Sequence, residues 1–228
     1  DSNYWRDVAG DYNGNFNDPA HWSLGAPPRA GDYVFFTNRQ SSAYVVQFTA
    51  SHTNFILKMF DDSVTFDLYG YRWTVNNGST TLADGSVIGT NCTYPMTVKF
   101  SSSHSAWAAG GNVVDFGTDA HHPDSIGGAT LNGRNTRVVV DDSLGSPVKV
   151  TFALGNGIVN SDSDILVSGS GSEFALGYMN GAYFNANMLV TNGATFRVLN
   201  VYGSGSIGYY AENATITVAN ASMFTPAM

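Results

Sequence analysis

The sequence has few charged residues and a single cysteine, and these shortages exclude several classes of protein. Charged side chains make up 12% of the 228 residues, which is about half the usual share. The 10 Lys and Arg residues are scattered singly and the formal net charge is −8. Neither nucleic acid nor an anionic membrane surface is therefore an expected partner. Cys92 has no second cysteine to pair with, and we interpret it as a small buried hydrophobe.

Long apolar runs and helix patterns are missing as well. No apolar stretch approaches the roughly 20 residues that span a bilayer. No signal peptide is present, and the chain opens at Asp1, as expected of a mature product after leader removal or of an artificial boundary. Hydrophobic residues still reach 43%, so the chain can bury a core. Ser, Thr, Asn and Gly replace the charges, a composition that favours a secreted β-protein.

Short β-branched and aromatic runs, broken by Gly, Asn, Asp and Ser, replace the helical pattern. Examples are Tyr33–Phe36, Ala43–Phe48, Arg137–Val140, Val148–Phe152 and Ile216–Val218. Runs of this length and composition predict strands, so we expect an all-β chain.

These runs form a repeat. The segments Ile165–Phe174, Met188–Phe196 and Ile216–Phe224 align with one another, and Trp73–Thr80 is an earlier copy. Each has a strand with a valine near its end, a corner of small residues and a second short strand. The repeat anchors are Val75, Val167, Val190 and Val218, with weaker copies at Val98, Val114 and Val140. Neighbouring anchors lie about 16–28 residues apart, a spacing typical of solenoid coils.

The repeat predicts a parallel β-helix, or β-solenoid, in a single domain. One coil cannot bury its inward side chains alone, whereas stacked coils pair strand to strand and share a continuous core. We expect residues 1–36 to form an N-terminal cap and first strand, and residues 37–228 to form the coils. A β-sandwich is the alternative fold, because it also contains many short strands. A sandwich does not predict the recurring corner after valine.

The N-terminal segment can be interpreted as a binding loop or as the start of the fold. The first coil of a solenoid would expose its core without a cap, so we favour the second interpretation. Two prolines give a stiff extended entry, and a Gly-Asp turn follows directly before the first strand, Tyr33–Phe36. The predicted structural cap residues are Trp5, Trp22, Pro27, Pro28, Gly31 and Asp32.

Both ends of the chain resemble known repeat proteins. The opening, with Trp5, Asn17-Asp18-Pro19-Ala20-His21-Trp22, Pro27-Pro28 and Gly31-Asp32, is similar to the segment that precedes β-solenoid repeats in large bacterial secreted and surface proteins. The later stretch Ile207-Gly208 to Ser222 resembles the autotransporter-associated or PEP-CTERM-type β-strand repeat. The resemblance implies a right-handed parallel β-helix on or outside a bacterial envelope. It implies no defined chemistry.

Candidate sites for metal binding and catalysis are weak. His121-His122-Pro123-Asp124 is the best metal candidate, but adjacent side chains of an extended segment point to opposite faces, so we predict a solvated loop. Asp141-Asp142 and Asp162-Ser163-Asp164 offer carboxylates for Ca²⁺, although turn hydrogen bonds explain them as well. Glu173 and Glu212 are the only glutamates, and no aspartate recurs at the coil period to build an acidic groove. We therefore expect no enzyme activity and no cofactor.

The function predicted from these patterns is structural. We expect an extracellular or cell-surface protein, a subunit or fragment of a bacterial fibre, matrix or adhesin. The chain stops at Phe224–Met228, one strand into a repeat, so either the natural protein continues or the subunits self-associate through their solenoid ends. The alternative is a surface module that binds carbohydrate through exposed Tyr and Trp, with a glycan as partner. A polysaccharide-degrading β-helix enzyme is the third interpretation.

Overall fold

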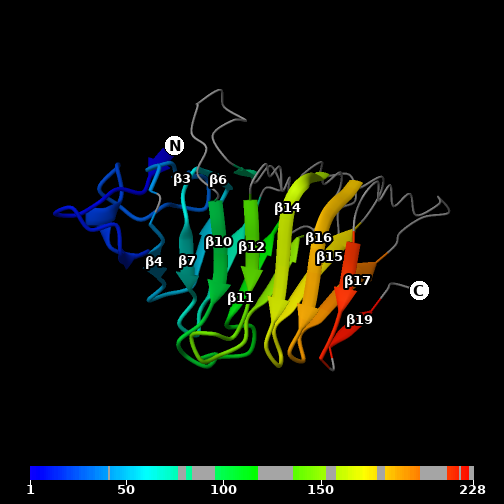
Figure 1. Cartoon of the computed structure of the whole chain (residues 1–228). Coiled ribbons are helices and arrows are strands. Elements are labelled where there is room, and N and C mark those ends of the chain that lie inside the picture. Colours follow the sequence, from blue (N-terminus) through cyan, green and yellow to red (C-terminus); the bar gives the residue numbers. More distant parts are fainter. Residues whose placement is uncertain are drawn as a thin grey trace.

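The computed structural model shows a nearly all-β chain built from three parallel sheets (Figure 1). It describes residues 1–40, 42–76, 81–83, 96–117, 136–152, 158–178, 183–200, 215–220 and 222–225. Within these residues the only helical element is the short 3-10 turn η1 (Pro19–His21). None of the described segments forms a helix of the length and hydropathy that a membrane crossing requires.

Most strands are short; from β4 to β9 they fall into the three sheets in rotation, and from β10 to β19 they alternate between two of the sheets (Figure 1). The four-stranded sheet contains β1 (Ser2–Tyr4), β3 (Tyr33–Phe36), β6 (Ile56–Phe60) and β9 (Thr81–Ala83). The eight-stranded sheet contains β2 (Gly14–Asn15), β4 (Tyr44–Gln47), β7 (Val64–Asp67), β10 (Met96–Ser101), β12 (Thr136–Val140), β14 (Ile158–Ser168), β16 (Tyr183–Thr191) and β18 (Thr215–Val218). The seven-stranded sheet contains β5 (His52–Asn54), β8 (Arg72–Val75), β11 (Val113–Phe116), β13 (Lys149–Phe152), β15 (Glu173–Tyr178), β17 (Thr195–Asn200) and β19 (Met223–Thr225).

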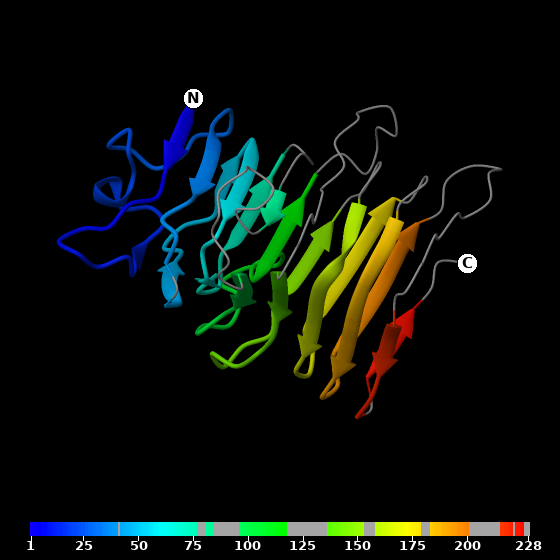
Figure 2. The same cartoon turned by 45° about the horizontal axis from the view of Figure 1, so that its top comes forward.

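Every ladder between these named strands is parallel, and strand order in each sheet follows the chain. The chain leaves a sheet, passes through another, and returns one strand further along, so the molecule lengthens from the N-terminal to the C-terminal end (Figure 2). The prediction of an all-β chain is confirmed. The alternative β-sandwich predicts antiparallel sheets, which the parallel ladders of the named strands do not match.

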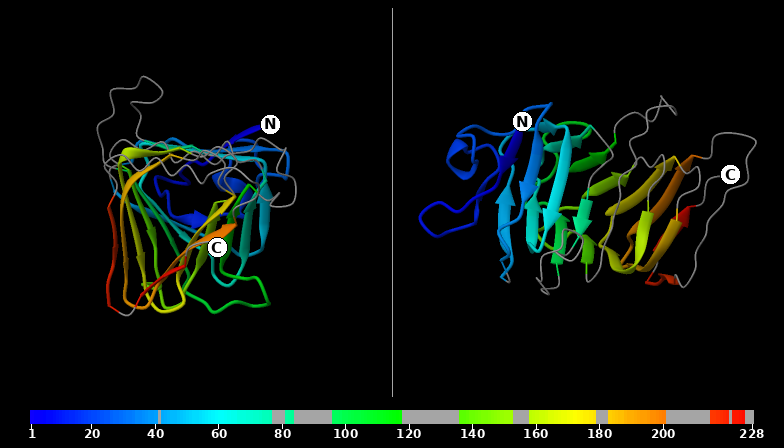
Figure 3. Two further views of the ribbon diagram at one scale, coloured as in Figure 1. Left: turned by 90° about the vertical axis from the view of Figure 1, so that its right-hand side faces the viewer. Right: turned by 90° about the horizontal axis from the view of Figure 1, so that it is seen from above.

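The three sheets face a common core. Side chains of several strands alternate between this core and the outside, as in β10, where Met96, Val98 and Phe100 are buried and the residues between them are partly exposed. Seen along its length, the molecule shows the sheets arranged around this interior (Figure 3). One cluster of buried residues joins strands of all three sheets. Rings stack along it, with centroids 5.6 Å apart for Phe66–Phe100 and 4.6 Å apart for Phe116–Phe152.

Tyr33–Phe36 is a strand as predicted, but it is not the first one. Ser2–Tyr4 and Gly14–Asn15 precede it, and β1 pairs with β3 through Asn3 and Val34. The inward residue of β1 is Asn3, which is 1% exposed and donates to the carbonyl of Ala26 at 2.8 Å. A strand whose buried residue is polar has no apolar alternation, which is why the sequence pattern did not reveal it.

Candidate functional site

Two of the four tryptophans are buried together at the N-terminal end. Trp5 and Trp22 are 1% and 0% exposed, and their rings meet edge to face with centroids 5.1 Å apart. The indole N–H of Trp5 donates to the Tyr12 carbonyl at 3.0 Å, and that of Trp22 donates to the Phe16 carbonyl at 2.7 Å. Buried rings with satisfied donors contribute to the core, so neither ring is open to a ligand.

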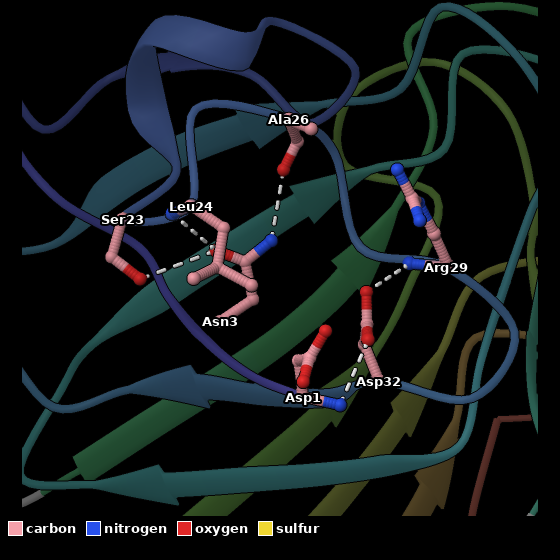
Figure 4. A network of polar contacts seen from close by, with 7 residues as sticks. All are labelled: Asp1, Asn3, Ser23, Leu24, Ala26, Arg29 and Asp32. Carbon is pink, nitrogen blue, oxygen red and sulfur yellow. Dashed lines mark hydrogen bonds and ion pairs between the residues drawn. The ribbon is translucent and has the colours of Figure 1, made fainter.

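Of the other predicted cap residues, Asp32 lies in a network of polar contacts with Asp1 and Arg29 (Figure 4). The turn before β3 is closed by the hydrogen bond from Asp32 N to Arg29 O at 2.9 Å. Asp32 is 7% exposed and accepts from the Arg29 N–H at 2.7 Å and from the Asp1 ammonium at 3.0 Å. Burial alone would raise the pKa of Asp32, and these two hydrogen bonds hold it below its ordinary value.

The prolines and Gly31 have different surroundings. Pro28 is buried and Pro27 is partly buried, and the Pro28 carbonyl accepts a hydrogen bond from His52 Nε2. Burial lowers the pKa of His52, partly offset by that hydrogen bond and by Asp32. Gly31 is exposed and has no atom within 4 Å of the place that a Cβ would take. A side chain at position 31 would therefore meet no steric obstacle in this turn.

The four predicted repeat anchors fall into two sheets. Val167 pairs with Val190, which pairs with Val218, and Val140 of the same ladder precedes them. Val75 instead lies in β8 of the seven-stranded sheet, in register with Phe116. The structure thus brings three anchors together and leaves the fourth in another ladder.

The last strand of that ladder exposes side chains that its neighbour buries. Ile216 and Val218 are each 41% exposed, whereas their partners in β16, Met188 and Val190, are 2% and 0% exposed. Parallel strands in register direct paired side chains to the same face of the sheet. Within the described residues, β18 is therefore an edge strand with an apolar, core-type face in contact with solvent.

Trp107 is the tryptophan that the structure places at the surface, with 55% of its area exposed. It lies in the segment between β10 and β11 and stacks on His104, with ring centroids 3.8 Å apart and planes 15° apart. Tyr69 and Tyr71 flank it at 6.2 and 6.3 Å. These four rings, named here the Trp107 cluster, were not distinguished by the sequence, because exposure of a tryptophan depends on the fold.

Two acidic residues, Asp115 and Asp62, have partners that give them structural roles. Asp115 pairs with Arg72, the residue that follows Tyr71 of the Trp107 cluster, and burial raises the pKa of Asp115 more than Arg72 lowers it. Asp62 is 0% exposed and accepts hydrogen bonds from Asn38 N at 2.8 Å, Gln40 N at 3.1 Å and Tyr44 Oη at 3.1 Å. Burial raises the pKa of Asp62. Its oxygens are occupied by the turn that it holds.

The predicted metal candidates are only partly within the described structure. His121, His122 and Asp124 lie outside the described residues, as does the side chain of Asp162. Asp141 accepts a hydrogen bond from Ser143 Oγ at 2.9 Å and pairs with Lys99 at 3.1 Å. Its carboxylate therefore stabilises a turn and forms an ion pair. Among the residues that the structure describes, no three His, Cys, Asp or Glu are grouped to hold a metal ion.

Comparison with known proteins adds no relative. No family model matches the chain, and neither the curated proteins nor the solved structures contain a match.

Proposed function

We propose that this chain is a right-handed parallel β-helix that serves as an extracellular structural protein. In this proposal it is a subunit or fragment of a bacterial surface fibre, matrix or adhesin and has no catalytic role. The low share of charged residues and the surface rich in Ser, Thr, Asn and Gly support a secreted protein. The handedness rests on the resemblance to bacterial repeat proteins and on the general preference for right-handed parallel crossovers.

The parallel ladders support the β-helix. Between β10 and β18 the chain alternates between the eight-stranded and the seven-stranded sheet and adds one strand to each at every passage. Each passage therefore contacts mainly the passages before and after it, which is the arrangement of a solenoid. The interior ladder Val98, Val138, Ile165, Met188 and Ile216 continues through five strands in register.

Aromatic side chains cover the core at the N-terminal end, and this coverage supports the proposal of a cap. Trp5 and Phe36 stack with centroids 5.7 Å apart, and Phe16 stacks on Phe48 at 4.4 Å. These contacts bury the interior of the first strands, an end at which a solenoid without a cap would expose its core. In this interpretation the segment before β3 closes one end of the helix.

The exposed face of β18 is the observation on which self-association rests. Ile216 and Val218 occupy positions whose equivalents in β16 are completely covered. Edge strands with apolar side chains accept a further strand, because pairing satisfies their backbone groups and removes the side chains from water. We propose that a strand from a second copy of the chain provides that cover.

Sedimentation and negative-stain electron microscopy of the purified chain test this proposal. We expect dimers, rods or fibres at micromolar to millimolar concentration, and we expect Ile216→Lys to weaken association by about 10-fold or more, because a charge would be buried at the contact. Leu189→Lys is the matched control, since Leu189 is also 41% exposed but lies between the inward residues Met188 and Val190 on the opposite face. A chain that stays monomeric throughout, or equal effects of both substitutions, would overturn self-association through β18.

A further inference from the structure

The Trp107 cluster goes beyond the proposed structural role, because its exposure is not needed to fill the core. An indole that is 55% exposed, grouped with three further rings, leaves apolar area in water, and such groups on a surface are candidate binding sites. His104 covers one face of the ring at a centroid distance of 3.8 Å. The stacked imidazole therefore covers only part of the indole, and more than half of the Trp107 surface stays in contact with solvent.

The indole is held in place at its edge. Its Nε1 donates to the Tyr69 carbonyl at 2.8 Å, and its backbone N–H donates to the Gly70 carbonyl at 3.2 Å. A Cβ on Gly70 would lie 2.5 Å from Trp107 Cδ1, so the ring approaches the backbone at a place that only glycine permits. Gly70 also has a φ of 87°, in the left-handed region.

Buried polar side chains fix the segment that carries the ring. Asn112 is 6% exposed; its Oδ1 accepts from Gly70 N and its Nδ2 donates to the His104 carbonyl, both at 2.8 Å. Asp67 is 3% exposed and accepts from Ser103 N at 2.8 Å and from Ser103 Oγ at 2.6 Å. The platform is thus organised before any ligand arrives, which lowers the entropic cost of binding.

Besides the buried Asp67, one ion pair lies close to the segment that carries the ring. Arg72 Nη1 lies 3.0 Å from the place that a Gly110 Cβ would take, and the guanidinium pairs with Asp115. This pair offers hydrogen-bond donors and acceptors without a net local charge. The chain as a whole carries −8, so nucleic acids, acidic glycans and anionic lipids are repelled rather than attracted.

We propose that the Trp107 cluster binds a neutral glycan. A pyranose ring has an apolar face of C–H groups and a rim of hydroxyls. The open face of Trp107 matches the C–H face, and Arg72 with Asp115 can bind hydroxyls at its border. An aromatic ring beside a few polar groups combines apolar contact with hydrogen bonding, the two kinds of contact that a pyranose offers. The site is independent of β18, so it does not depend on self-association.

Isothermal titration with neutral oligosaccharides tests the proposal. We suggest hexamers of β-1,4-glucose, β-1,3-glucose, xylose and mannose against the full chain, with heparin and single-stranded DNA as charged probes. Trp107→Ala is expected to weaken binding by about 10- to 100-fold, as for a central aromatic contact, while Trp107→Phe retains part of it. Tyr4→Ala is the matched control, because Tyr4 is 42% exposed and stacks on Phe35 at 4.5 Å.

The outcomes separate this site from other uses of the surface. Because Trp5, Trp22 and Trp73 are buried, quenching of the exposed tryptophan fluorescence by acrylamide reports on Trp107, and a bound glycan should protect it. Ile216→Lys should leave glycan binding unchanged even if it abolishes self-association. The proposal is overturned if no neutral hexamer binds at millimolar concentration, if only the charged probes bind, or if Trp107→Ala and Tyr4→Ala weaken binding equally.

Discussion

Single polar residues hold the turns of this molecule by accepting several hydrogen bonds each. Asp67 accepts from Gln47 Nε2 at 2.9 Å, Tyr69 N at 3.0 Å and two Ser103 donors. Asp62 does the same for Asn38 and Gln40 at the turn where Arg39 has a φ of 58°. Leaving buried donors without a partner costs about 1–3 kcal/mol each. Such side chains therefore determine where the chain can turn.

Asp32 gives the N-terminal turn a dependence on pH. Its pKa lies below the ordinary 3.8, because the Arg29 N–H and the Asp1 ammonium outweigh the effect of burial. An acid whose pKa is lowered by folding stabilises the folded chain above its unfolded pKa, and that contribution is lost as the pH falls through the folded pKa. Urea denaturation should show Asp32→Asn to be less stable than the parent at pH 6, with the difference shrinking below about pH 3.8.

Asp62 also makes stability depend on pH, so the contribution of Asp32 is measured as the difference in unfolding free energy between the parent and Asp32→Asn at each pH. Burial raises the pKa of Asp62, so its ionisation on going to higher pH reduces stability, the opposite sign to Asp32. Asp62 is present in both proteins and its contribution cancels when the two are subtracted. A difference that is the same at pH 6 and pH 3 would contradict the role assigned to Asp32.

The sequence could identify residue types at this scale but not their exposure. Trp5, Trp22 and Trp107 look alike in the sequence, yet two are 0–1% exposed and one is 55% exposed. The nearby prolines Pro27-Pro28 and the turn at Gly31-Asp32 allowed the sequence to predict that Trp22 belongs to a cap. Nothing local marks Trp107, because its platform is formed by Gly70 and Asn112, which lie 37 residues before it and five after it.

At the scale of elements, the corners between sheets require left-handed backbone. The strands ending near Val167, Val190 and Val218 are followed by Gly169, Gly193 and Asn220, with φ of 96°, 80° and 53°. Only glycine, and less often asparagine, adopts this region at small cost. This requirement is why the repeat is visible in the sequence as valine followed by a small-residue corner.

The repeat predicts an inward valine but not the neighbours of the strand that carries it. An inward valine is needed in every sheet, so its presence does not tell which sheet a strand joins. Val75 ends β8 with the same local pattern, but it pairs with Phe116 rather than with the ladder of Val167. Register is determined by contacts between strands that are far apart in the chain.

Gly169 provides a test of the corner. Its φ is 96°, and an added Cβ would lie 2.1 Å from Asp142 Cγ. Gly169→Ala therefore strains the backbone and forces the carboxylate to move, and we expect a loss of about 1–2 kcal/mol in the free energy of unfolding. Gly31→Ala is the control, since Gly31 has open space and an ordinary φ; it should change stability by no more than about 0.5 kcal/mol. Equal effects in urea denaturation would contradict the steric explanation.

At the scale of the whole molecule, stability comes from a core shared along the length of the chain. Phe116 is 0% exposed and lies between Phe100 at 5.9 Å and Phe152 at 4.6 Å. Rings from successive strands thus connect neighbouring passages of the chain, and among the described strands the largest contacts are between strands that pair in the same sheet. In such a structure each passage is stabilised by its own packing and by the interface with its neighbours.

Phe116→Ala tests whether the molecule unfolds in this local manner. Removing a buried phenylalanine costs about 3–5 kcal/mol, and the loss should fall on the strands that contact it, β8 and β13, which pair with β11 on either side. Hydrogen exchange should therefore increase most over Arg72–Val75 and Lys149–Phe152, and least over Ser2–Tyr4 at the capped end. Phe116→Leu keeps most of the volume and should restore most of the protection. If exchange increases equally over the described strands, including β1, the chain unfolds as one cooperative unit and the local picture is wrong.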